Sequence, residues 1–157
     1  MATEHNSGAT SPPKTYGLNE VSIRVTQSPG RAVSSKNNIL KLNGAGSSSL
    51  EREGQPLPFF YTPKAMLTLL NHLYRIRFFE MSADYSVGYS VFLKDDGSIG
   101  TQALKMSDAP NTRVCFSVPA YEKCVTYGAH GPRELEDVVQ KLLTEANGLV
   151  SLPPPLK

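Results

Sequence analysis

The strongest constraint on the fold is an alternating segment near the middle of the chain. Apolar side chains occupy every second position from Tyr85 to Leu93, and the turn-forming sequence Asp95-Asp96-Gly97-Ser98 follows. A two-residue period places one set of side chains on each face of a β-strand, and glycine supplies the positive φ that a tight hairpin turn needs. Because an apolar pattern resumes from Ile99 to Met106, the segment predicts an antiparallel hairpin within a sheet.

Other segments predict further strands. Three of them alternate or are enriched in apolar residues, at 20–26, 38–43 and 113–118. A fourth runs from Tyr74 to Met81, with Tyr74, Ile76 and Phe78 on one side. The Gly/Ser-rich residues 44–49 are typical of a loop, and residues 120–127 fit either an edge strand or a helical turn.

Two segments carry the period of an amphipathic helix. Thr62-Pro63 is a helix start, with threonine as N-cap and proline at the first position, and apolar residues then recur on one face: Met66, Leu69, Leu70 and Leu73. A second helix begins after Gly131-Pro132 and is expected to end at Gly148. Its apolar face consists of Leu135, Val138, Val139, Leu142, Leu143 and Ala146.

This order of elements predicts an α+β fold. We expect an antiparallel meander sheet of four to six strands, with the two amphipathic helices packed on one face. The 157 residues divide into a flexible N-terminal arm (1–18), a single domain (19–150) and a Pro-rich C-terminal tail (151–157). Arm and tail contain little that a core would bury.

The sequence also predicts where the protein is found. No run of about 18 apolar residues exists, so we expect no transmembrane segment. The first residues lack the basic and apolar regions of a secretory signal, and two cysteines do not form a disulfide framework. We therefore expect an intracellular protein, in the cytoplasm or nucleus, with its cysteines in a reducing environment.

Catalytic and metal sites are weakly indicated. Cys115 or Cys124 with His130, oriented by Asp108 or Asp137, would supply the groups for thiol catalysis. Neither cysteine lies at a predicted helix start, and a free cysteine on a strand is usually a small buried hydrophobe. The cysteines form no CxxC motif, and His72 is expected at the boundary of the core. We therefore expect no catalytic residues, no metal and no cofactor.

One surface stands out once the apolar strand faces are directed toward the helices. The opposite face would then combine cations and phenyl rings: Arg75, Arg77, Phe79, Phe92, Lys94, Lys105 and Arg113. Single-stranded nucleic acid binds such surfaces, because phosphates pair with cations while bases stack on rings. Duplex DNA is disfavoured, because the net charge is only +2 and no dense basic stripe occurs.

The sequence thus predicts a non-enzymatic binding or assembly module. We expect it to form homo-oligomers and to contact single-stranded nucleic acid through this face, as a small viral structural or nucleic-acid-associated protein does. Three alternatives stay open for the face itself: plain solvated surface, cover by the N-terminal strands, or pairing of two subunits through exposed rings. Two stay open for the function: a protein-interaction adaptor without nucleic-acid contact, or a small Cys-dependent enzyme.

Overall fold

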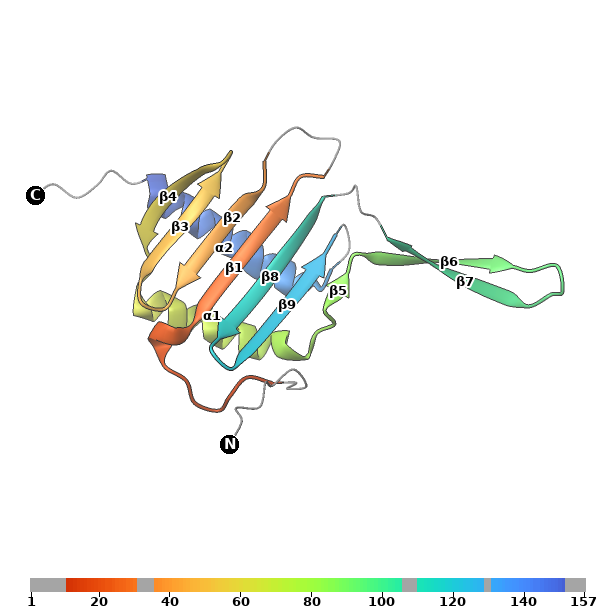
Figure 1. Ribbon diagram of the computed structural model, residues 1–157, viewed down its shortest axis with the longest axis horizontal. Coiled ribbons are helices and arrows are strands. Elements are labelled where there is room, and N and C mark those ends of the chain that lie inside the picture. Colours follow the sequence, from red (N-terminus) through yellow and green to blue (C-terminus); the bar gives the residue numbers. More distant parts are fainter. Residues whose placement is uncertain (1–10, 31–35, 106–109, 129–130, 152–157) are drawn as a thin grey trace, which may run out of the picture.

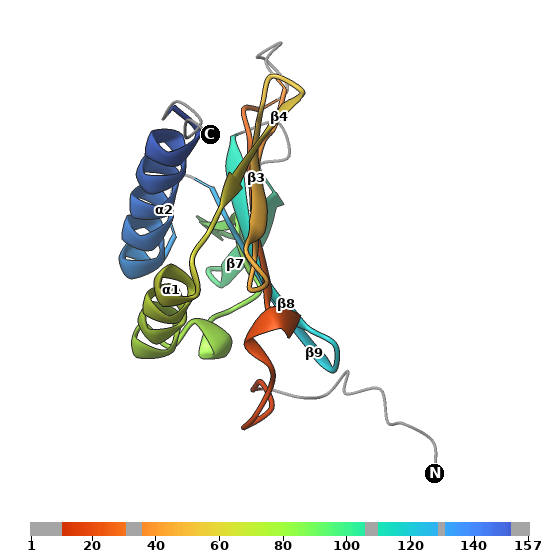
Figure 2. The same cartoon turned by 90° about the vertical axis from the view of Figure 1, so that its left-hand side faces the viewer.

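The protein has an α+β architecture in which two helices cover one face of a large, mostly antiparallel sheet (Figures 1 and 2). The computed structural model describes residues 11–30, 36–105, 110–128 and 131–151. Short 3-10 helices lie at Leu18–Glu20 and Phe78–Glu80. The other elements are β1 (Ser22–Ser28), β2 (Asn38–Asn43), β3 (Ser47–Arg52), β4 (Gln55–Phe60), α1 (Pro63–Arg75), β5 (Asp84–Tyr85), β6 (Val87–Leu93), β7 (Ile99–Lys105), β8 (Asn111–Val118), β9 (Tyr121–Tyr127) and α2 (Arg133–Ser151).

The main sheet has seven strands in the order β4-β3-β2-β1-β8-β9-β5. The first strand of the chain, β1, lies inside the sheet and pairs antiparallel with both β2 and β8. The two-residue strand β5 is parallel to β9. The sheet is therefore larger than the expected meander of four to six strands.

The core lies between the sheet and the helices, as the apolar periodicities predict. In α1 the residues Met66, Leu69, Leu70 and Leu73 are buried. The Thr62 side chain accepts a hydrogen bond from the Ala65 N–H, which confirms the predicted start of this helix. Helix α2 buries most of its predicted apolar face but continues through Gly148 to Ser151, so the predicted stop was wrong. The buried members of that face are Leu135, Val138, Val139, Leu142 and Ala146.

The predicted strand at 74–81 is wrong. Helix α1 continues to Arg75, and Arg77 then adopts a left-handed conformation with φ of 60°. The 3-10 helix that follows places Phe78 and Phe79 both in the core, rather than on opposite faces of a strand. The alternation of apolar residues here reflects a helix end and a tight turn, which a period of two does not distinguish from a short strand.

Phe79 is the centre of an aromatic cluster that links this turn to the sheet. Its ring centroid lies 4.8 Å from that of Tyr74, 4.9 Å from that of Phe116 on β8, and 6.1 Å from that of Tyr121 on β9. Tyr16, within the predicted N-terminal arm, also contacts Phe116, and its hydroxyl group lies 2.7 Å from that of Tyr74. Burial and this hydrogen bond raise the pKa of Tyr16.

The Gly/Ser-rich segment 44–49 is a turn followed by the start of β3, not a loop throughout. Ser48 is buried because its hydroxyl group is fully used: it accepts a hydrogen bond from the Asn43 N–H and donates one to the Gly46 carbonyl. A buried polar side chain with both partners costs little. Residues 120–127 form strand β9, which resolves the ambiguity of that segment in favour of a strand.

The predicted hairpin forms, but it does not join the main sheet. Strands β6 and β7 pair only with each other and project from the body as a separate ribbon (Figure 1). Both neighbours of β8 are already taken, by β1 on one side and β9 on the other, so β7 cannot pair with the strand that follows it in the chain. The expectation that its apolar residues face the helices was wrong.

Candidate functional site

The projecting hairpin carries an uncovered apolar face. Tyr89, Val91 and Leu93 of β6 share one face, and Ile99 of β7 is the cross-strand partner of Leu93. Their exposed fractions are 74% for Tyr89, 65% for Val91, 70% for Leu93 and 62% for Ile99. A monomeric protein seldom exposes such a contiguous group of large apolar side chains. This face is the first candidate for a functional surface.

Contacts on the opposite face of the hairpin and at its turn stabilise the pairing of the two strands. Phe92 pairs with Gly100 across the ribbon, and a Cβ atom at Gly100 would lie 2.5 Å from the Phe92 ring. The ring therefore lies over the glycine, an arrangement that compensates for the missing side chain. At the turn, the Asp96 carboxylate accepts hydrogen bonds from the backbone and hydroxyl group of Ser98, which lower the pKa of Asp96.

The edges of the hairpin differ from those of the main sheet. Edge strand β4 contains Pro56 and Pro58, which lack the N–H that a further strand would need. The other edge strand, β5, has only two residues. Both features limit the growth of a sheet. Strands β6 and β7 have seven residues each, and neither contains proline, so the ribbon has the longest unprotected edges among the described residues.

The seven predicted binding residues do not share one face. Phe79 is buried in the core, and Arg75 ends α1. Arg77 forms an ion pair with Glu80 at 2.9 Å, and this contact raises the pKa of Arg77. Three residues belong to the hairpin and one to β8: Phe92 and Lys94 on or beside β6, Lys105 at the end of β7, and Arg113 on β8.

The helix-free face of the main sheet is a second candidate surface. Register places Lys41 of β2 beside Arg24 of β1, and Arg24 beside Cys115 of β8. Arg113 lies two residues before Cys115 on the same face and is exposed. Only Arg113 was predicted here. Arg24 and Lys41 alternate with the apolar residues of their own strands, and this alternation could have identified them once β1 and β2 were placed inside the sheet.

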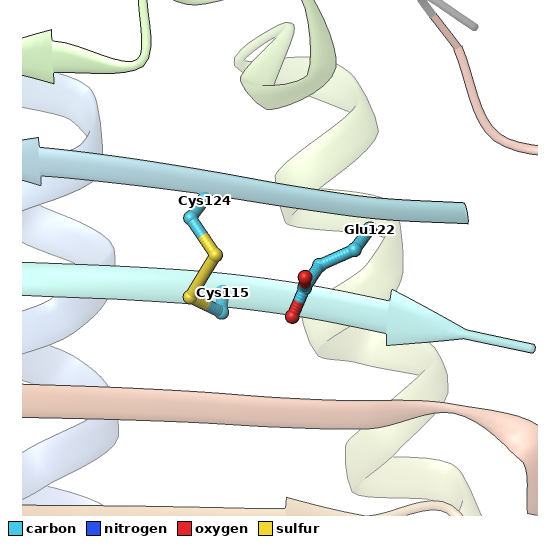
Figure 3. Close-up of side chains that lie close together, drawn as sticks. All are labelled: Cys115, Glu122 and Cys124. Carbon is cyan, nitrogen blue, oxygen red and sulfur yellow. A yellow bond between two sulfur atoms is a disulfide. The ribbon is translucent and has the colours of Figure 1, made fainter. Parts of the chain in front are cut away.

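This face contains a disulfide bond and a nearby carboxylate. Cys115 and Cys124 are direct cross-strand partners with a Cα–Cα distance of 4.1 Å, and they form a disulfide. Glu122 projects from β9 beside them (Figure 3). A shallow depression of about 300 Å³ is lined by Arg24, Arg113, Cys115 and Glu122, together with serine and threonine side chains. The expectation of two reduced cysteines was therefore wrong in this structure.

The thiol-catalysis hypothesis gains no support from this arrangement. Both sulfur atoms are used in the disulfide. His130 and Asp108 lie outside the described residues, and Asp137 belongs to α2, on the other side of the sheet (Figure 2). His72 lies on α1 and lines a small cavity of about 120 Å³ between the two helices, so it is remote from the cysteines in the fold.

No protein family, no curated protein and no solved structure matches the chain. Among the residues that the structure describes, neither helix combines the length and apolar composition that crossing a bilayer requires.

Proposed function

We propose that the protein is a non-enzymatic assembly module that self-associates through the apolar face of the β6–β7 hairpin. The observation that carries this proposal is the exposure of Tyr89, Val91, Leu93 and Ile99 on one side of a ribbon that projects from an otherwise well-packed body. An isolated two-stranded hairpin is at best marginally stable in water. A partner that covers the apolar face would stabilise it.

A second copy of the chain is the partner that the chemistry favours. Among the described residues, Thr101 is the cross-strand partner of Val91 on this face, and the register places one charged residue on it, Lys105, beside Val87 at the base of the ribbon. The outer parts of two such faces, from Tyr89 to Ile99, can pack against each other without burying a charge, whereas a partner with charged groups would have to desolvate them. In a two-fold dimer the same patch is used twice, so the surface has to be complementary to itself, and the patch of Tyr89, Val91, Leu93 and Ile99 meets that requirement.

The size of the face is also appropriate. The four exposed side chains offer on the order of 500 Å² per copy, so two copies would bury about 1,000 Å², the lower limit for a specific interface. We therefore propose a reversible dimer rather than an obligate one. Pairing of the free ribbon edges would add backbone hydrogen bonds to this apolar contact.

Contact with single-stranded nucleic acid is not the function that we favour. Stacking of bases and pairing of phosphates require rings and cations on one surface. In the described part of the chain, the cations of the open sheet face share it with one exposed ring, Phe60 of edge strand β4. Phe92 and Lys94 lie together over Gly100 on the hairpin, so rings and cations are divided between two surfaces and are not gathered on one. An adaptor role for a different protein partner would use the same hairpin, and the oligomeric state distinguishes the two.

The first experiment is the molar mass of the full chain over a wide concentration range. Multi-angle light scattering is expected to give a mass that rises from one chain to two as concentration increases. Salt is not expected to reverse this rise, since apolar association is not screened by ions. A mass of one chain at every concentration would contradict self-association. If that monomer also sedimented with lipid vesicles or captured a defined protein, the hairpin would serve another partner.

A further inference from the structure

The cysteine pair on the open sheet face is accessible from solvent, whereas a disulfide in the core would be fully buried. Cys115 and Cys124 are half-buried and point away from the helices, toward the face of the sheet that no helix covers (Figures 2 and 3). Reductants and ions therefore have access to the sulfur atoms. The site lies on the main sheet, apart from the hairpin, and does not depend on the proposed self-association.

The sheet does not need the disulfide to hold these residues together. Strands β8 and β9 form a continuous antiparallel ladder from Thr112↔Tyr127 to Val118↔Tyr121, on both sides of the cysteine pair. Their inner faces are anchored in the core by Val114, Phe116 and Val125. A bridge that closes so short a loop, with the two cysteines only nine positions apart in sequence, adds little to a ladder that is already closed. The reduced protein should therefore keep the two thiols side by side.

Reduction would leave three ligand atoms in one place. The Cys115 and Cys124 sulfur atoms and a Glu122 carboxylate oxygen all lie within 4.8 Å of one another. Around a tetrahedral zinc ion, ligand atoms lie about 3.3–3.8 Å apart, since Zn–S distances are about 2.3 Å and Zn–O distances about 2.0–2.2 Å. Rotation of the three side chains alone can bring their ligand atoms to these distances. Water would occupy the fourth position, because the face is open to solvent.

The charges of the surrounding residues suit a bound divalent cation. Two thiolates and one carboxylate carry three negative charges, of which a divalent ion neutralises two. Arg24, the register partner of Cys115, and Arg113 line the same depression and offset the remainder. Two sulfur ligands select thiophilic ions such as Zn²⁺ or Cd²⁺ over Mg²⁺ and Ca²⁺, which prefer oxygen.

We propose that Cys115, Cys124 and Glu122 form a redox-gated binding site for a thiophilic divalent cation. A dithiol reductant opens the disulfide: its thiolate attacks one sulfur to form a mixed disulfide, and its second thiolate then releases the protein dithiol while the reductant becomes a disulfide. The cation binds this dithiol with release of its two protons. A low-molecular-weight disulfide or diamide reverses the step: it takes two electrons from the two cysteine thiolates and is itself reduced, the protein disulfide forms again, and the ion is expelled because the same sulfur atoms cannot serve both bonds.

The missing CxxC motif does not argue against this site. Sequence spacing reveals metal ligands when they lie in one loop, whereas here the antiparallel register of β8 and β9 brings together residues nine positions apart. Glu122 joins them because it lies two residues before Cys124 and so shares its face.

The test uses the full chain, reduced and desalted without oxygen, and titrated with Cd²⁺. We expect the near-ultraviolet band of cadmium–thiolate charge transfer to saturate at one ion per chain, and Zn²⁺ to compete for it. Protein oxidised with diamide should show no band. Cys115→Ser and Cys124→Ser should each abolish one-to-one binding, with circular dichroism confirming that the sheet is retained.

Glu122→Gln separates the three-ligand site from a simple thiol pair. We expect this variant to bind Cd²⁺ about tenfold or more weakly, since loss of even an outer-shell partner costs about 10–100-fold in metal affinity. Glu51→Gln is the matched control, because Glu51 lies on the same face in β3, with β2 and β1 between it and β8, and its affinity should equal that of the wild type. Absence of the band in the reduced protein, an equal band in the oxidised protein, or wild-type affinity in Glu122→Gln would each overturn the proposal.

Discussion

Replacing Phe79 by alanine is expected to lower the free energy of unfolding by about 3–5 kcal/mol, which is the cost of removing a fully packed phenyl ring. Phe79 is only 7% exposed and contacts Tyr74, Phe116 and Tyr121. Its loss would leave a cavity where α1 meets strands β8 and β9. Chemical denaturation followed by circular dichroism measures the effect.

Phe92→Ala is the control for this prediction. Phe92 is 45% exposed and covers Gly100 on the projecting ribbon, outside the main core, so its replacement should cost less than about 1 kcal/mol. If Phe79→Ala fails to fold, Phe79→Leu, which keeps most of the apolar volume, should show a smaller but measurable loss. If Phe79→Ala and Phe92→Ala lowered the free energy of unfolding by equally small amounts, Phe79 would have to be exposed. That result would contradict the aromatic cluster.

The double variant Val91→Lys/Leu93→Lys is expected to keep the protein monomeric at concentrations where the wild type is a dimer. Each lost apolar contact removes about 1.5–3 kcal/mol of burial, so the pair should weaken association by about 100-fold or more. Two ammonium groups would also have to be desolvated at the interface. Light scattering at matched concentrations measures the shift, and circular dichroism should show an intact main sheet.

Ser90→Lys/Gln102→Lys provides the matched control. It adds the same charge to the same ribbon, but Ser90 and Gln102 are cross-strand partners on the opposite face. Repulsion between copies at this distance from the interface is screened by salt, so the control should dimerise nearly as the wild type does at moderate ionic strength. If both double variants dissociate equally, charge rather than the apolar face governs association, and the proposed interface is wrong.

Local periodicity predicted the parts of the fold that depend on a buried stripe or an N-cap. The helix that begins at Pro63 and the alternating strands at β1 and β8 follow directly from their sequences, because each buries one face and exposes the other. The hairpin turn at Asp96-Gly97 was also predicted from its local sequence. These signals are local, and the structure retains them.

What sequence reasoning missed depends on long-range pairing and on single backbone angles. The left-handed Arg77 turns an apparent strand into a helix end and sends Phe79 into the core. The choice of β1 and β9 as the neighbours of β8 leaves the hairpin unpaired, and no local pattern reveals that choice. The predicted site was misplaced for the same reason. Alternation correctly placed Val91 and Leu93 on one face of a strand but assigned that face to the core, whereas the sheet topology leaves it exposed.

Self-association requires that a second copy of the chain covers the hairpin, and amide hydrogen exchange tests this directly. Peptides spanning residues 87–105 should exchange slowly at high protein concentration and much faster on dilution, while peptides from β1 remain protected throughout. A lone ribbon is too weakly stable to protect its own amides. Rapid exchange in residues 87–105 at every concentration, beside a protected β1, would contradict self-association through the hairpin.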